Sequence, residues 1–150
     1  MDTMEKEVKT MKTSEVVGVY NVLKSLKISK LKKEDQFAVI RAARALKPVA
    51  TAFDDFIKDA QERLRPADFD AVDEKRGRFE QLTAAEKEEV TAAVRAYNKD
   101  VNDCVQTEAD REVEVGDFTR VTDDVIAGLV AGNENLDIET VMILQDVIGG

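Results

Sequence analysis

The longest regular pattern of apolar and polar positions in the chain runs from Glu34 to Leu64. Pro48 interrupts the pattern, but the apolar positions stay in phase across it, so we expect a kinked helix and not a break. The rest of the chain is expected to pack on this helix, with Phe53 and Ile57 at the centre of the core. The apolar residues recur at steps of three or four, which places them on one helical face: Phe37, Ile40, Ala43, Leu46, Ala50, Phe53, Ile57, Ala60 and Leu64.

Shorter helical patterns lie on both sides of this segment. Residues 13–27 predict a helix with Thr13 or Ser14 as its N-cap. Thr83 and Glu86 form a capping box that predicts the start of another helix, which extends through Val105. Residues 121–131 and 138–148 predict two more helices, the second capped by Asp137. The charged residues 66–82 predict a long connector with one irregular helical turn.

The residues between Arg111 and Phe118 change to a period of two, which is typical of a half-buried strand. Only the region from Met4 to Met11 offers a pairing partner, although residues 1–12 can also be read as a frayed end. We therefore expect a mainly α fold, an antiparallel helical bundle built on the long Pro-kinked helix 34–64. A short two-stranded β ribbon would join residues 4–11 to residues 112–118, all in a single domain of residues 1–150.

Charge is distributed unevenly in a chain whose net charge is −9. Residues 1–47 hold 11 Lys and Arg against 6 Asp and Glu, whereas the remainder is strongly acidic. We interpret the basic segment as a solvated face that pairs with acidic residues of the same fold. The alternative is a phosphate-binding surface of a small nucleic-acid-associated or regulatory protein. The basic side chains are Lys24, Lys27, Lys30, Lys32, Lys33, Arg41, Arg44 and Lys47.

The composition excludes most kinds of catalytic site and of metal site. The chain has no histidine and a single cysteine, Cys104, which falls among apolar positions and is expected to be a small buried side chain. Glycine-rich phosphate loops and a nucleophile elbow are absent from the sequence. We therefore predict no catalytic residue, no cofactor and no metal site. Neither a signal peptide nor an 18-residue apolar run is present, so we expect a cytoplasmic protein.

One carboxylate pattern is similar to that of the all-α nucleotide pyrophosphohydrolases, which offer ExxE and ExxD pairs to Mg²⁺. The matching residues are Glu86 and Glu89, then Glu114 and Asp117. Glu86 is already engaged by the capping box, and the second pair lies in a strand-like stretch, where positions i and i+3 do not share a face. A magnesium-dependent pyrophosphohydrolase is therefore the second alternative.

The last helical pattern, residues 138–148, is apolar around most of its circumference, so it must be buried in its own fold or against another chain. The basic and acidic parts of the sequence can also satisfy each other between chains. We therefore expect a homo-oligomer, or a monomer that awaits another protein. The contacts would centre on Val141, Leu144 and Ile148.

Three segments carry a resemblance to known proteins: SEVVGVYNVLKSLK, FAVIRAARALKPVATAFDDF and LDIETVMILQDVIGG. In this order, with a Lys-rich link and a charged spacer, they resemble a group of small, mostly uncharacterised helical proteins encoded by tailed bacteriophages and prophages. The resemblance implies a virion-assembly or host-interaction role without enzyme activity, in the host cytoplasm or in the virion. We accordingly expect a non-enzymatic helical protein that binds itself or another phage or host protein, with no membrane partner.

Overall fold

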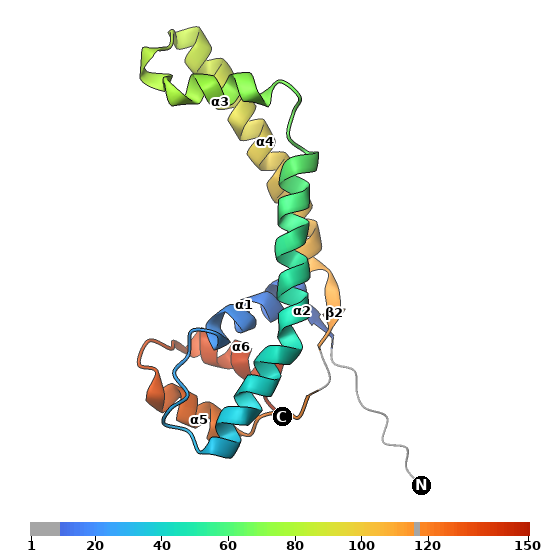
Figure 1. Ribbon diagram of the computed structural model, residues 1–150, viewed down its shortest axis with the longest axis vertical. Helices are drawn as coiled ribbons and strands as arrows, with labels where there is room; N and C mark the ends of the chain where they lie inside the picture. The colour runs from blue at the N-terminus through green and yellow to red at the C-terminus, as the bar shows by residue number, and fades with distance from the viewer. Residues whose placement is uncertain (1–9, 116–117) are drawn as a thin grey trace. The chain divides into compact units, whose positions relative to one another are not determined.

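The computed structural model describes residues 10–115 and 118–150. The described chain is mainly α-helical, with six α-helices and one short antiparallel pair of strands, as the sequence predicts (Figure 1). The elements in chain order are β1 (Thr10–Lys12), α1 (Thr13–Leu23), α2 (Lys33–Arg63), α3 (Phe69–Gly77), the 3₁₀ turn η1 (Phe79–Gln81), α4 (Ala84–Asp110), β2 (Glu112–Glu114), α5 (Asp123–Gly132) and α6 (Ile138–Ile148).

The chain divides into two compact units. Unit 1 consists of the residues up to Phe53 together with those from Ala109 to the end, and unit 2 consists of Asp54–Glu108. Helix α2 continues through Pro48 without a break, as predicted, and contributes residues to both units. The expectation of a single domain stays a prediction.

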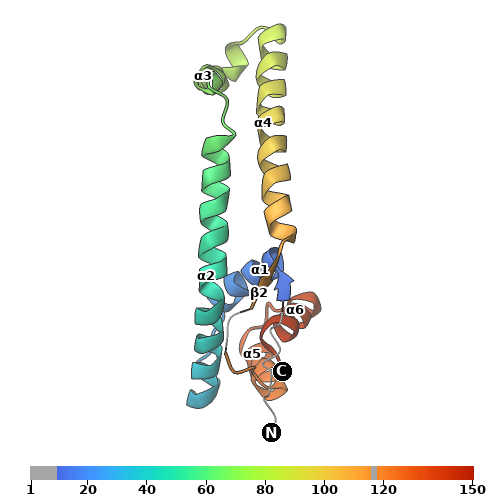
Figure 2. The ribbon, with the colours of Figure 1, turned by 90° about the vertical axis from the view of Figure 1, so that its right-hand side faces the viewer.

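The core of unit 1 is built mainly from α1, α5 and α6. Helices α1 and α5 both pack against α6, which Figures 1 and 2 show in two orientations. Helix α6 is therefore an integral part of this core. The largest fully buried side chains are Leu46, Leu129, Leu144, Ile148, Val16, Val19, Val121 and Val147.

Helix α2 contributes a different face to this core from the predicted one. Its core residues are Val39, Ala42 and Leu46, whereas Phe37 and Ile40 are 51% and 38% exposed. The prediction was wrong here because residues 37–46 are apolar at nearly every non-arginine position, so helical spacing fits two different faces. Packing against α1, α5 and α6 determines which of these two faces of α2 is buried.

Phe53 and Ile57 are half-buried and do not lie at the centre of the core, which corrects a second prediction. The α2 residues of the main core cluster end at Leu46, about two helical turns before Phe53. Beyond Ala50, the only fully buried residue of α2 is the small Ala60.

Strands β1 and β2 pair as the period-two pattern predicts, with Met11 opposite Val113. The predicted strand residues Met4 to Lys9 lie outside the described residues. Thr13 begins α1 but does not cap it through its side chain. Its buried hydroxyl instead donates to the carbonyl of Arg111 at 2.8 Å, and its backbone N–H donates to the same oxygen at 2.9 Å. These bonds tie the start of α1 to β2.

Unit 2 has a small core around Phe69, which is 4% exposed. The ring of Tyr97 lies 4.8 Å from the ring of Phe69, and its hydroxyl donates to the carbonyl of Gln61 at 2.7 Å. The charged connector thus contains a regular helix, α3, where the sequence indicated one irregular turn. The capping box at the start of α4 is confirmed, because the amide of Glu86 donates to the hydroxyl of Thr83.

Candidate interaction site

The basic segment begins in the loop between α1 and α2. The side-chain amide of Asn133 forms two hydrogen bonds with the backbone of this loop. Its Oδ1 accepts from the backbone N–H of Lys27 at 2.8 Å, and its Nδ2 donates to the carbonyl of Lys27 at 2.9 Å. These bonds attach the loop to the end of α5. The backbone from which the basic side chains of the loop project is therefore held in place.

Four basic side chains in the first half of α2 lie on its surface. Lys33, Arg41, Arg44 and Lys47 are exposed, and none of them forms an ion pair with a residue that the structure describes. Pairing within the fold, our interpretation from the sequence, is therefore not found for these four cations.

Two of these arginines share one helical face with the unexpectedly exposed apolar residues. Phe37, Ile40, Arg41 and Arg44 follow the spacing i, i+3, i+4 and i+7, and all four are exposed. We call these four residues the α2 stripe. Each guanidinium offers several donors in a planar fork that matches a carboxylate. The stripe therefore combines an apolar contact area with two free carboxylate-binding groups.

A hollow of about 340 Å³ lies between α1 and α6 on the same unit. Val19 and Leu144, both buried, contribute apolar surface to it. Gly18 leaves space above them, since a Cβ atom added there would meet nothing within 4 Å. We call this feature the α1/α6 hollow. Its lining residues are Ser14, Glu15, Gly18, Val19, Val22, Thr140, Ile143 and Leu144.

One carboxylate lines this hollow and a second lies near it. Glu15 lines it, and Glu139 lies one helical turn before Ile143, so it projects on the same side of α6. Neither carboxylate has a hydrogen-bond or ion-pair partner among the described residues, and no lysine or arginine lines the hollow. The α1/α6 hollow is thus apolar inside and acidic at its rim.

The predicted contact residues of α6 require a correction. Leu144 and Ile148 are fully buried in the core of unit 1, and Val141 is half-buried, because α1 and α5 cover this side of the helix. The exposed apolar side chains of α6 are Ile138 at 78%, Met142 at 57% and Ile143 at 39%. The exposed apolar surface that α6 offers to another molecule therefore consists of these residues instead.

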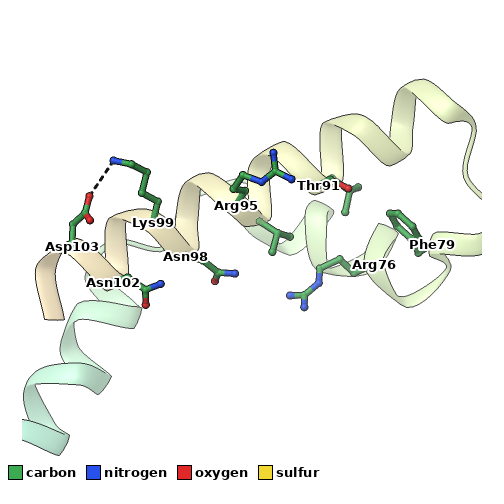
Figure 3. A pocket seen from close by; sticks show the side chains of 10 residues that line it. Arg76, Phe79, Thr91, Arg95, Asn98, Lys99, Asn102 and Asp103 are labelled. Atoms are coloured by element: carbon green, nitrogen blue, oxygen red, sulfur yellow. Dashed lines mark hydrogen bonds and ion pairs between the residues drawn. The ribbon is translucent and has the colours of Figure 1, made fainter. Parts of the chain in front are cut away.

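Unit 2 carries an open groove of about 770 Å³ along α4 (Figure 3). The positive charge of Lys99 is already paired with Asp103 at 3.1 Å, and Arg76 lies 3.4 Å from Asp73. Arg95 is left as the cation without an ionic partner among the described residues. The lining residues are Arg76, Phe79, Val90, Thr91, Val94, Arg95, Asn98, Lys99, Asn102 and Asp103.

The carboxylates of the pyrophosphohydrolase pattern are not arranged as two helical pairs. Glu86 accepts a hydrogen bond from the Thr83 hydroxyl at 3.0 Å, which holds the pKa of this carboxyl below its ordinary value. Glu114 lies on β2, and Asp117 is outside the described residues. In the described part of the chain, no three acidic or cysteine side chains are placed to hold a metal ion together.

Cys104 is half-buried rather than fully enclosed, and its sulfur accepts a hydrogen bond from Arg63 at 3.5 Å.

Over residues 10–115 and 118–150, no helix is both long enough and apolar enough to cross a membrane.

Part of the interaction site was detectable in the sequence. The basic segment was identified, but Phe37 and Ile40 were assigned to the core. The signal that could have placed them outside is the position of Arg41 and Arg44, which share their face. The hollow left no such signal, since it depends on how α1 and α6 pack.

We compared the chain with protein-family models, with curated proteins and with solved structures, and none of them matches it.

Proposed function

We propose that this chain is a non-enzymatic helical protein that acts by docking to other proteins, in virion assembly or host interaction of a tailed bacteriophage or prophage. The phage setting is supported by the resemblance of its three apolar segments to small helical phage proteins. The docking role is supported by the surface of unit 1.

The observation that carries the docking role is the α2 stripe. An exposed phenylalanine and an exposed isoleucine are followed on the same helical face by two arginines that have no ionic partner among the described residues. Aromatic residues and arginines are enriched among the side chains that dominate protein–protein binding, whereas lysine is depleted there. The stripe is therefore suited to a partner with an apolar depression and carboxylates beside it.

A nucleic-acid partner is the alternative that the same basic segment supports. Binding to a phosphate backbone relies on several lysines and arginines and needs no apolar centre. Here half of the stripe, Phe37 and Ile40, is apolar, and the chain as a whole carries a net charge of −9, which repels nucleic acid. Both features favour an acidic protein surface.

Site-specific photo-crosslinking tests the proposal. A benzophenone amino acid replaces Ile40 in cells that carry the genome encoding this chain, and a matched control replaces Lys58, which is exposed in unit 2. We expect light-dependent adducts to protein from position 40 and few from position 58. Replacing Arg41 and Arg44 with serine should reduce the adducts at position 40.

The nature of the adduct decides the outcome. Protein adducts at position 40 that depend on the arginines would support a docking surface. Adducts to nucleic acid alone would replace the proposal with the nucleic-acid-associated alternative. An equal yield from positions 40 and 58, or none from either, would contradict the proposal.

A further inference from the structure

We infer that the α2 stripe of one copy docks into the α1/α6 hollow of a second copy of this chain. The inference rests on the proposed function and names the partner of the stripe. It also assigns a role to the hollow, which the proposed function leaves unused.

The two surfaces match in their apolar parts. The stripe presents Phe37 and Ile40 one turn apart, and the hollow offers a floor of buried aliphatic side chains above which Gly18 leaves open space. The hollow, about 340 Å³, lies at the lower end of the range of roughly 300–1,000 Å³ for binding cavities. This size suits a pair of side chains from a helix rather than a whole small molecule.

Their charges match as well. Arg41 and Arg44 continue the stripe with two guanidinium groups, while Glu15 lines the hollow and Glu139 lies near it; none of the four has an ionic partner in the described part of the chain. Docking would bring these four charges together at the edge of an apolar contact as charge-assisted hydrogen bonds. Complementary charges at a rim chiefly set orientation and encounter rate, and the apolar contact supplies the affinity.

The contact joins two different surfaces of the same unit. Such heterologous contacts leave a free stripe on one copy and a free hollow on the other, so they continue into a ring or a filament. Blocking the stripe on one copy and the hollow on another should therefore stop growth at two copies.

Two variants provide the blocks. Phe37→Asp places a charge in the apolar part of the stripe, at an exposed position near the start of α2 where an acidic residue is tolerated. Gly18→Leu fills the hollow without a clash at its Cβ and replaces a helical glycine with a better helix former. Both variants are expected to fold, and circular dichroism would check this.

Static light scattering then gives the mass of each sample. We expect the wild-type chain to associate with rising concentration, each variant alone to stay at the mass of one chain, and their equimolar mixture to reach twice that mass and stop. Two matched controls should associate like the wild type. They are Gly18→Ala, which leaves the hollow open, and Val130→Asp, which changes an exposed apolar residue of α5 in the same way.

A mixture that stays at the mass of one chain would overturn the inference, as would either blocked variant that associates like the wild type. A wild-type chain that is monomeric at all concentrations would also overturn it. In that case, arginine-dependent protein adducts at position 40 would still support the proposed function with a different protein as partner. The two proposals can thus fail separately.

Discussion

Leu46 is the largest fully buried side chain that α2 contributes to unit 1. It is fully buried in the main core, whereas Phe53 on the same helix is half-buried. We expect Leu46→Ala to lower the free energy of unfolding by about 2–5 kcal/mol, through lost transfer energy and a residual cavity. Phe53→Ala should cost less. Chemical denaturation of both variants would check this, and a larger loss for Phe53→Ala would contradict the assignment of the core.

The cap of α6 should make stability depend on pH in the acid range. The pKa of the Asp137 carboxyl lies below its ordinary value, first because of a hydrogen bond with the side chain of Thr140 and second because the carboxylate accepts the Thr140 backbone N–H at 2.8 Å. A lowered pKa in the folded state stabilises the fold at pH values above the ordinary pKa, near 3.8. That contribution is lost as the pH falls through the lowered pKa.

Asp137→Asn isolates this effect, because asparagine caps a helix about as well as aspartate but does not titrate. We expect the stability of the variant, followed by denaturation from neutral to acid pH, to fall less steeply than that of the wild type. If the free energies of unfolding of the variant and the wild type fell in parallel through the acid range, the carboxylate of the cap would not be the group that titrates.

Single residues were predicted correctly where the signal is local. The Thr83–Glu86 capping box and the Asp137 cap each depend on residues three positions apart, so the sequence contains the whole interaction. Thr13 was predicted as a cap and instead bonds to Arg111, 98 positions away. No local pattern encodes that bond.

At the scale of elements, the sequence identified the helices but not always their buried faces. The alternation of apolar and polar residues predicted the strand at 112–118, and a ribbon with residues 4–11 was expected, but the register that sets Met11 opposite Val113 comes from the structure. Helix α2 has apolar residues on two faces between positions 37 and 46, and tertiary contacts decide which face is buried. The same ambiguity led α6 to be assigned contact residues that lie in the core.

The position of α6 leads to a prediction about truncation. Its C-terminal end is fixed by the backbone bond from Val121 to Ile148 and by the guanidinium of Arg120, which donates to the carbonyl of Val147. We expect deletion of residues 138–150 to unfold unit 1. Circular dichroism should then lose more helical signal than the 11 residues of α6 account for.

The exposed face of α6 provides the control for this deletion. Met142→Gln changes a residue that is 57% exposed, so it should leave the helical signal unchanged. Loss of only the α6 signal on truncation would mean that the helix is an appendage whose removal the rest of unit 1 tolerates.

At the scale of the whole molecule, the division into two units was not visible in the sequence. Its boundaries fall inside α2 and α4, so no turn-rich linker or change in composition marks them. The interaction site was only partly predictable for a related reason. The basic segment is continuous in the sequence, whereas the α1/α6 hollow joins residues more than 115 positions apart.

The most direct test of docking between copies is hydroxyl-radical labelling of side chains over a series of protein concentrations. Phe37 is 51% exposed, Ile143 is 39% exposed, and Phe79 of unit 2 serves as an internal reference. We expect labelling of Phe37, in the stripe, and of Ile143, which lines the hollow, to fall together as concentration rises, while labelling of Phe79 stays constant. Labelling of Phe37 that is the same at every concentration would contradict the docking of one copy on another.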